Sequence, residues 1–455
     1  MPAEVFRSYD IRGLAVGELS ADLFFQIGRA FPLMLPTDLP RRVCVGHDTR
    51  THAKPFADAL IQGLLESGCD VTFLGPTTTP MVYWAEHYLG SVSAGLMVTG
   101  SHTGPDRNGL KMSVGKRPFY GKDIQRLKHA IESGTNPKTQ KGELTHQGLR
   151  TQYVKSLVAD FDLQISQPIV WDLGGGATSF LAQQLQQALP SNHHFINTTP
   201  QGKPARSFDP TAPKALDGLI QTMQQKNATL GMAFDGDGDR LVVIDKEGDV
   251  WNGDQLFLLF AQNQNSNAPC VVDIKTSPLL TKFLEKKRPV LVSPTGHVHV
   301  KTLMSREGAT LGGEVSGHFF FKDTHPGFDD GLYAAFRLLE VLSRNTIDIV
   351  SWKKALPKRF STPEIRIPLA PKKQKFFLDM LKSHAQKSGA HICTIDGLLV
   401  SEDHGWHIAR PSQTEPVLVL RWEGQTQEYY LSTQRLFGRM LSKIGEGMEF
   451  FRDLC

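Results

Sequence analysis

The fold is decided by a stretch in which an apolar run gives way to a polar loop, AGLMVTGSHTGPDRNGLK (residues 94–111). The apolar residues at its start predict a buried strand, and the Gly, Ser, Thr, Pro, Asp and Asn residues after it predict a loop. Ser101 follows the carboxyl end of that strand, where open α/β sheets carry their chemistry, and His102 and Lys111 come after it. From this segment alone, a hairpin or crossover turn with a solvated serine fits equally well.

A second polar loop, DGDGDR (residues 235–240), lies between the apolar segments GMAF (231–234) and LVVI (241–244). Three carboxylates at alternate positions of a glycine turn repel one another unless a cation lies among them, and their hard oxygens suit Mg²⁺. A calcium loop would need Gly and Glu at its sixth and twelfth positions, where this chain has Arg240 and Lys246. A purely structural turn remains the alternative.

Composition narrows the class of protein and its partners. Of 455 residues, 40% are hydrophobic and 21% charged, which is typical of a globular chain of three or four domains. The formal net charge is +4, and the densest basic run, KKQK (372–375), opens a predicted helix as a solvated face. We therefore expect no nucleic acid partner, whereas anionic small molecules fit the charge.

Features of targeting and redox chemistry point to the cytoplasm. No apolar run reaches the length of a membrane span, and the first residues lack the apolar core of a signal peptide. The five cysteines are scattered without a CxxC pair, and Cys44, Cys270 and Cys393 lie in apolar runs, which predicts reduced core residues. We therefore expect no membrane association.

Strand and helix patterns alternate along most of the chain, which predicts mainly parallel sheets covered by helices. Polar breaks near 135–144, 251–253 and 355–360 divide the pattern, and the part after the last break has an α+β pattern. The predicted domains are 1–146, 147–249, 250–357 and 358–455.

Three shorter segments receive structural interpretations. Asp254 is predicted to cap a helix over 255–263, and the acids of Asp-Asp-Gly (329–331) are predicted to cap the helix that follows them rather than to catalyse. The run GGGAT (174–178) invites a nucleotide-binding interpretation, but without a full GxGxxG fingerprint a tight strand-to-helix turn is favoured.

Five segments together resemble the α-D-phosphohexomutase superfamily, and specifically its bacterial phosphomannomutase/phosphoglucomutase group. They lie at 9–13, 98–111, 235–240, 312–318 and 410–416, in the order of the family's motifs, so the resemblance covers nearly the whole chain. It implies four domains around a central cleft, three of them related mixed-sheet α/β domains and the last a smaller α+β domain.

The chain departs from the family pattern at three positions. Thr103 stands where the family usually has Asn, Gly100 where Ala is common, and Gln413 where Gly is usual. The glycine often serves a special φ angle, so Gln413 is expected to reshape the phosphate-binding loop. None of the three removes a residue that must carry out chemistry.

The resemblance implies a phosphoserine enzyme. Ser101 would carry a phosphoryl group, transfer it to a hexose monophosphate to give a 1,6-bisphosphate, and receive the other phosphate back after the intermediate reorients. Asp235, Asp237 and Asp239 would hold one Mg²⁺ ion, with a phosphate oxygen on Ser101 as a further ligand.

The same resemblance assigns expected roles to the remaining site residues. Arg240 would meet the transferring phosphate, and Lys111 would be a general acid or base if burial lowers its pKa. His102 would orient the serine loop, although a structural histidine fits as well. Arg12 and Tyr9 are expected to line the cleft. The sugar would be bound by Glu314, Ser316 and His318, and the distal phosphate by Arg410, Ser412, Gln413 and Thr414. Lys275 and His297 would complete the sugar or phosphate contacts, although solvated loop positions fit them as well.

One distal site serving two ligand orientations predicts modest selectivity at the sugar, so mannose and glucose phosphates are both expected as substrates. A hexose 1,6-bisphosphate would act as intermediate and activator, and a monomer or weak dimer is expected. The alternatives left open are a phosphoglucosamine mutase and a non-catalytic sugar-phosphate-binding protein.

Overall fold

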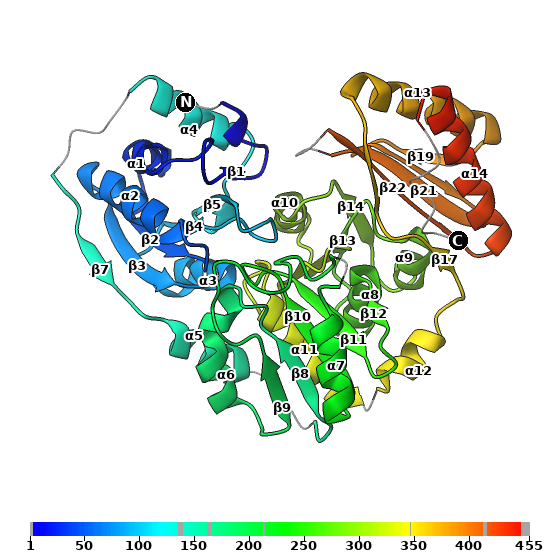
Figure 1. The fold of residues 1–455 in the computed structure, drawn as a ribbon, viewed down its shortest axis with the longest axis horizontal. Helices are drawn as coiled ribbons and strands as arrows, with labels where there is room; N and C mark the ends of the chain where they lie inside the picture. The colour runs from blue at the N-terminus through cyan, green and yellow to red at the C-terminus, as the bar shows by residue number, and fades with distance from the viewer. Residues whose placement is uncertain are drawn as a thin grey trace.

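The computed structural model describes residues 3–134, 140–159, 161, 165–212, 214–345, 347–412 and 416–446. Its four sheets follow one another in chain order along an arc, with the first and the last at the two ends (Figure 1). Three sheets mix parallel and antiparallel pairs, and the fourth is antiparallel throughout. The predicted fold class, three related α/β domains followed by an α+β domain, is confirmed.

The first sheet has the order β1-β5-β4-β2-β3-β7, with β6 paired to β5. Its strands are β1 (Ile11–Leu14), β2 (Arg42–His47), β3 (Asp70–Pro76), β4 (Ala94–Val98), β5 (Arg107–Val114), β6 (Arg117–Pro118) and β7 (Leu144–His146). The helical segments around it are η1 (Ala3–Val5), α1 (Ala21–Ala30), η2 (Phe31–Met34), α2 (Ala53–Glu66), α3 (Thr79–Tyr88) and α4 (Lys122–Glu132).

The second sheet has the order β12-β11-β10-β8-β9 and the third β14-β13-β15-β16. The second domain contains α5 (Arg150–Ala159), β8 (Ile169–Asp172), η3 (Ala177–Leu181), α6 (Ala182–Ala188), β9 (His193–Ile196), α7 (Asp217–Lys226), β10 (Leu230–Phe234), β11 (Leu241–Asp245) and β12 (Val250–Trp251). The third contains α8 (Gly253–Asn263), β13 (Cys270–Asp273), α9 (Pro278–Glu285), β14 (Val290–Ser293), α10 (His297–Glu307), β15 (Leu311–Gly313), β16 (Phe319–Phe321), α11 (Gly331–Asn345) and α12 (Ile349–Lys354).

The last domain is a sheet of order β17-β22-β21-β20-β19, with β18 also paired to β22 and with two long helices. Its elements are β17 (Phe360–Ser361), β18 (Ile365–Pro368), α13 (Pro371–Ser388), β19 (His391–Cys393), β20 (Leu398–Glu402), β21 (Gly405–Pro411), β22 (Val417–Gly424) and α14 (Gln427–Lys443).

The first three sheets share one topology. The neighbouring strands run β3-β2-β4-β5 in the first, β9-β8-β10-β11 in the second and β14-β13-β15-β16 in the third. In each, the first three strands are parallel and the fourth is antiparallel to the third. The hairpin that joins the third strand to the fourth contains residues 99–106, 235–240 or 314–318. Three of the predicted functional loops are therefore the same connection in three related sheets.

Two local predictions are corrected by the structure. Residues 107–111, predicted as part of a loop, belong to strand β5, which pairs with both β1 and β4. Helix α8 begins at Gly253, and its capping box is formed by Asn252 with Gln255 rather than by Asp254. Asp254 is instead buried and accepts a hydrogen bond of 3.1 Å from Nη2 of Arg421.

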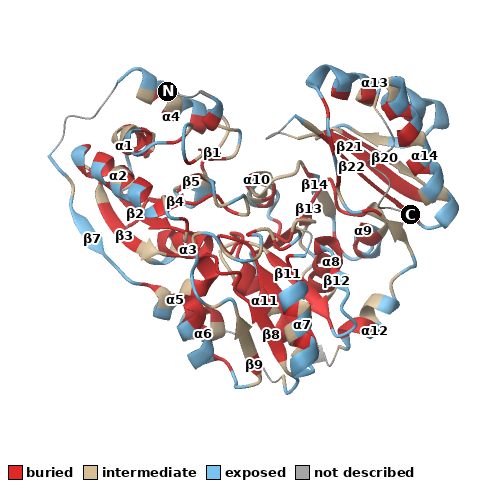
Figure 2. Cartoon of the chain, in the orientation of Figure 1, coloured by how far each residue is buried: buried red, intermediate tan, exposed pale blue. Residues whose placement is uncertain are grey.

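The interior is continuous across the first three domains. One apolar cluster contains Met97 from the first sheet, Trp171 from the second and Phe319 from the third, whereas Trp422 belongs to a separate core in the last domain. Figure 2 shows this buried interior along the sheets. Part of each of the first three domains therefore shares one apolar cluster, and a smaller cluster of Ile274 with Leu399, Trp406 and Ile408 joins the last domain to the third.

Buried charged groups attach the last domain to the third. Nη1 of Arg421 donates to the carbonyl oxygen of Lys275 at 2.5 Å, and its Nη2 contacts Asp254. The hydroxyl of Ser277 donates to Glu423 at 2.5 Å. Burial alone would lower the pKa of Arg421, but Asp254 and Glu423 raise it, so the guanidinium stays charged inside this network.

Cys44, Cys69 and Cys270 are buried free thiols, whereas Cys393 is only partly buried on strand β19. Cys393 was predicted as a core residue but is only partly buried, because β19 is an edge strand that pairs with β20 alone. Within the described residues, no helix has both the length and the apolar character that a membrane crossing requires.

Candidate active site

The serine loop (residues 99–106) and the carboxylate loop (residues 235–240) are in contact, although they belong to different domains. Oγ of Ser101 is 3.4 Å from Oδ2 of Asp235, which is 134 positions later in the chain. A Cβ atom at Gly236 would lie 2.3 Å from the carbonyl oxygen of Ser101, so only glycine permits this approach. Both loops follow buried strands, and the repeated topology brings their two hairpins together.

The serine loop is held in a conformation that serine rarely adopts. Ser101 has a φ of 52° and is buried, and its amide donates to Oγ1 of Thr99 at 2.8 Å. Asp48 accepts hydrogen bonds from Thr99 and Arg50, and Arg50 donates in turn to the carbonyl oxygens of Ser101 and Thr103 at 2.9 and 2.6 Å. Backbone strain of this kind persists only where surrounding contacts enforce it, and it is concentrated at functional sites.

Replacing Arg50 with leucine is expected to lower the free energy of unfolding by about 3–5 kcal/mol, because Asp48 would remain buried without its cation. The matched control is Arg42→Leu, which breaks a partly exposed pair with Asp70 and is expected to cost less than about 1 kcal/mol. Urea unfolding of both variants measures the difference, and equal losses would contradict the anchoring role of Arg50.

Asp235, Asp237 and Asp239 are buried, and each offers a carboxylate oxygen within 4.8 Å of the others. Nζ of Lys111 donates to Asp237 at 2.7 Å and also to Asp239. Burial alone would lower the pKa of Lys111, but these two carboxylates hold it well above its ordinary value, so the condition under which Lys111 would be a general acid or base is not met in this arrangement.

The carboxylate loop suits a divalent cation. Oδ1 of Asp237 and Oδ1 of Asp239 are buried and receive no hydrogen bond from any residue that the structure describes. Burial, together with Asp239 and Asp237, raises the pKa of Asp235 well above its ordinary value, which is the response expected of acids crowded without enough positive charge. Hard oxygen atoms with unused lone pairs match the ligand preference of Mg²⁺.

Arg240, His318 and His102 lie around the serine. Nε of Arg240 donates to Nε2 of His318 at 3.0 Å, and Nδ1 of His102 is 3.2 Å from Oγ of Ser101. Burial first, then the positive charges of Arg240, Arg12 and Lys111, lower the pKa of His102 well below its ordinary value. His102 is therefore neutral and can exchange a hydrogen bond with the serine.

A second group of predicted residues lies at the loop between β14 and α10. The hydroxyl of Tyr9 donates to the carbonyl oxygen of Thr295 at 3.2 Å, and Glu314 accepts from the amide of Gly296 at 2.8 Å. Burial first, then Asp396, raises the pKa of Tyr9 to about 12, so its hydroxyl remains a donor. Ser316 is half-buried in the same hairpin as Glu314.

The cations predicted to bind phosphate have carboxylate partners. Nζ of Lys275 is 2.5 Å from Glu364, Nε of Arg410 donates to Asp396 at 3.0 Å, and Arg12 pairs with Asp10. The amide of Ser412 donates to the carbonyl oxygen of Val417 at 2.8 Å. Gln413 and Thr414 lie outside the described residues.

Several residues that shape this site were missed from the sequence. Asp48 and Arg50 follow the carboxyl end of β2, and Ser101 follows that of β4. Because the two strands are parallel, these residues lie at the same edge of the sheet. That adjacency was a usable signal. Asp329 was interpreted only as a helix cap, yet its Oδ2 lies 3.0 Å from Nδ1 of His297 and 3.2 Å from Nδ1 of His318. Only the tertiary fold brings these three residues together.

The neighbouring Asp330 does cap α11, because its Oδ1 accepts from the amide of Tyr333 at 3.0 Å, and its Oδ2 accepts from Tyr153. Burial raises the pKa of Asp330 from 3.8 to about 7. The folded state therefore binds a proton that the unfolded state has released, and stability falls as pH rises between these two values. Asp330→Asn imitates the protonated acid and is expected to flatten this decline, measured by urea unfolding across that pH range. An unchanged slope would contradict the assignment.

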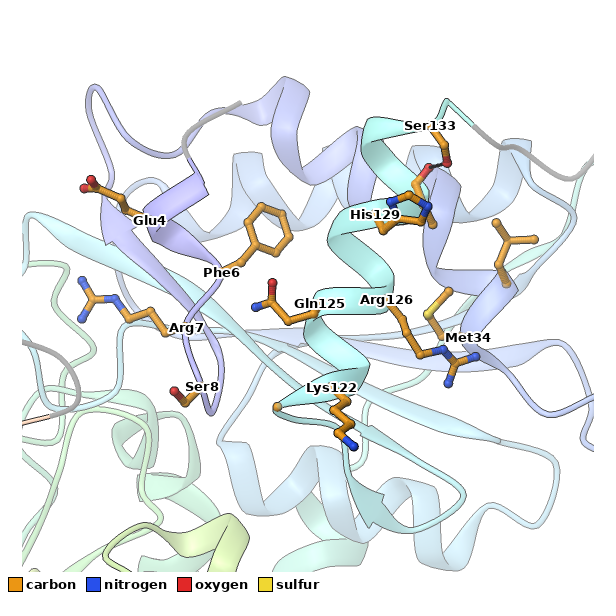
Figure 3. Close-up of a pocket in the computed structure, with 13 residues that line it drawn as sticks. Glu4, Phe6, Arg7, Ser8, Met34, Lys122, Gln125, Arg126, His129 and Ser133 are labelled. Carbon is orange, nitrogen blue, oxygen red and sulfur yellow. Dashed lines mark hydrogen bonds between the residues drawn. The ribbon is translucent and has the colours of Figure 1, made fainter. Parts of the chain in front are cut away.

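A cavity of about 1310 Å³ lies on the first domain, apart from the serine and carboxylate loops (Figure 3). Its lining includes the charged side chains of Glu4, Arg7, Lys122 and Arg126, beside apolar groups such as Phe6. None of the predicted catalytic residues is among its lining residues, so the chemistry is assigned to the loops described above.

Comparison with known proteins agrees with this geometry. The chain matches all four domain descriptions of one family, "Phosphoglucomutase/phosphomannomutase, alpha/beta/alpha domain I", II and III, and its "C-terminal domain", over 3–138, 151–248, 252–360 and 364–432. It is 36% identical over 455 residues to a phosphomannomutase/phosphoglucomutase of Pseudomonas syringae pv. tomato, covering 99% of this chain and 97% of that protein.

Two further relatives show the same likeness. A phosphoglucomutase of Neisseria meningitidis serogroup A is 36% identical over 435 residues, covering 93% of this chain and 94% of that protein. A crystal structure of a phosphoglucomutase/phosphomannomutase family protein from Burkholderia thailandensis is similar with a TM-score of 0.88 and 36% identity, covering 98% of each chain.

The family matches and the full-length relatives, together with a serine beside a carboxylate triad, indicate an intramolecular phosphotransferase of the isomerase type. With all four domain matches and full-length relatives, this chain belongs to the phosphoglucomutase/phosphomannomutase family.

Proposed function

We propose that the enzyme interconverts the 6-phosphates and 1-phosphates of mannose and glucose through a phosphoserine at Ser101. The observation that carries this proposal is the 3.4 Å contact between Oγ of Ser101 and Asp235, which puts a nucleophile beside a carboxylate loop that suits a divalent cation. Asp235, Asp237 and Asp239 would hold Mg²⁺, which would neutralise charge on the transferring phosphoryl group.

In the forward half-reaction, a free hydroxyl of the bound hexose phosphate attacks the phosphorus on Ser101. The bond from phosphorus to Oγ breaks, a bond to the sugar oxygen forms, and the hydroxyl proton passes to a nearby base. His318 is the candidate for that base, Oγ of Ser101 takes up a proton as it leaves, and Arg240 stabilises the equatorial oxygens. The product, a hexose 1,6-bisphosphate, reorients and returns its other phosphoryl group to Ser101.

The group around Arg410 supports the second part of the proposal, a site that holds the non-reacting phosphate. Arg410 and Lys275 supply positive charge, Tyr9 supplies a hydroxyl, and Glu314 and Ser316 can bind adjacent sugar hydroxyls in either ligand orientation. Because such a site does not distinguish the configuration at carbon 2 of the sugar, we propose that both mannose and glucose phosphates are accepted.

We also propose that the domains have the predicted boundaries, that the protein is cytoplasmic, and that it is a monomer or a weak dimer.

The test is turnover of purified protein with mannose 1-phosphate, glucose 1-phosphate and glucosamine 1-phosphate, in the presence of Mg²⁺ and glucose 1,6-bisphosphate. The proposal expects comparable kcat/KM for the first two sugars. A clear preference for the glucosamine ester would replace the substrate assignment. No turnover with any ester, and no phosphate on Ser101, would favour a binding protein instead.

A further inference from the structure

Asp329 lies at a point where two histidines and a lysine of the third domain converge. Its Oδ2 is 3.0 Å from Nδ1 of His297 and 3.2 Å from Nδ1 of His318, and its Oδ1 accepts a hydrogen bond of 2.8 Å from Nζ of Lys301. The carboxylate is fully buried, and the two imidazole rings are stacked with their centres 5.5 Å apart and their planes at 14°. A single carboxylate thus accepts a hydrogen bond from one ammonium group and lies within ion-pair distance of two rings.

The carboxylate is charged in this setting. Burial alone would raise the pKa of Asp329, but Lys301 and then His297 hold it well below its ordinary value. Lys301 also lies over the ring of Tyr83, 4.5 Å from its centre, so the ammonium is held from a second side. The two imidazoles therefore face a fixed negative charge at their Nδ1 atoms.

Asp329, at 3.2 Å from Nδ1 of His318, is nearer than Asp239 at 3.7 Å, and both carboxylates favour the same tautomer of His318. A proton on Nδ1 is favoured by the carboxylate, and Nε2 must then carry the lone pair, which accepts the hydrogen bond from Nε of Arg240 at 3.0 Å. The opposite tautomer would place a lone pair against Asp329 and a proton against the guanidinium. A continuous contact thus runs from Asp329 through His318 to Arg240.

We infer that Asp329 is the positioning residue for phosphoryl transfer, because it fixes His318 and, through it, the guanidinium of Arg240. This inference rests on the proposed function, in which Arg240 meets the phosphoryl group carried by Ser101. Asp239, His318 and Asp329 also offer ligand atoms within 4.8 Å of one another, but this assignment places the ion among Asp235, Asp237 and Asp239, where Asp329 does not touch it. It acts in the way that a buried carboxylate orients a catalytic imidazole.

The test compares Asp329→Asn with Asp330→Asn, a matched control. Both replace a fully buried acid by its amide at adjacent positions, but Asp330 contacts Tyr153 and the start of α11 rather than His318. Asp329→Asn is expected to lower kcat about 10- to 100-fold with little change in KM for the hexose phosphate, whereas Asp330→Asn keeps the wild-type kcat.

A second variant separates positioning from folding. Asp329→Asn leaves the ammonium of Lys301 buried without its carboxylate, so the double variant Asp329→Asn with Lys301→Met removes both charges. Stability is expected to recover in the double variant while kcat remains low. Recovery of kcat along with stability would overturn the inference, since the loss would then be structural.

A spectroscopic readout tests the same point without turnover. The imidazole ¹⁵N signals of His318, assigned with His318→Gln, are expected to report the Nδ1–H tautomer in the wild type and a mixture in Asp329→Asn. Unchanged signals would overturn the inference even if kcat falls. Absence of mutase turnover in the wild-type enzyme would instead count against the proposed function, because the tautomer measurement does not depend on it.

Discussion

Replacing Ser101 with alanine is expected to lower mutase turnover by more than about 10⁴-fold, because the nucleophile that forms the covalent intermediate is removed. The wild-type protein is expected to gain the mass of one phosphoryl group after incubation with glucose 1,6-bisphosphate, and the variant is expected to gain none. Intact-mass measurement and the coupled mutase assay read these two effects independently.

The matched control is Ser113→Ala. Ser113 is also a buried serine of the first domain, but its hydroxyl donates to Glu86 and not to the carboxylate loop. This variant is expected to keep both its phosphorylation and most of its turnover. If Ser101→Ala still accepts a phosphoryl group, or turns over like the control, another residue is the nucleophile and the proposed mechanism is wrong.

The second large effect is expected for Asp237→Asn. Two unit charges about 4 Å apart in an effective dielectric of about 20 attract by about 4 kcal/mol, and Mg²⁺ carries two charges, so its affinity should fall at least about 10³-fold. The amide would also weaken the contact with Nζ of Lys111, now at 2.7 Å. Calorimetric titration with Mg²⁺ measures the affinity directly, and turnover at saturating Mg²⁺ measures what remains.

Asp245→Asn provides the control for this change. Asp245 is a buried acid at the far end of β11, and it accepts from the indole of Trp251 at 3.0 Å, away from the triad. It is expected to leave Mg²⁺ affinity unchanged. An affinity in Asp237→Asn equal to that of the control would show that the triad does not hold the ion.

The sequence was informative where apolar runs end in unusual polar loops. The segments around Ser101 and Asp235 were predicted as loops after buried strands, and both follow strands in the structure. Strand β5 was missed because Arg107, Asn108, Gly109 and Lys111 give it the composition of a loop. Its strand conformation comes from pairing with β1 and β4 on its two sides, which no local pattern reports.

Residues that act across long sequence separations were the hardest to predict. Asp254 is a residue type that often caps helices, but Asn252 is the cap of α8. The carboxylate of Asp254 instead accepts a hydrogen bond from Arg421, 167 positions away. Asp329 likewise precedes the residue that does cap a helix, Asp330, but its own carboxylate contacts His297 and His318. Local propensity cannot predict which of two adjacent acids caps a helix when the contact of the other acid with a distant cation or imidazole determines the outcome.

The buried attachment of Arg421 has a mechanical consequence for the last domain. Breaking such a desolvated charge network is costly, so a swing of this domain that preserves it must pivot near Arg421 on β22. In the sheet, Arg421 pairs with Ile408, and Arg410 is only two residues further along β21, about 7 Å along the strand from Ile408. A given angle of swing therefore displaces Arg410 little, so the lever arm is short where the phosphate is expected.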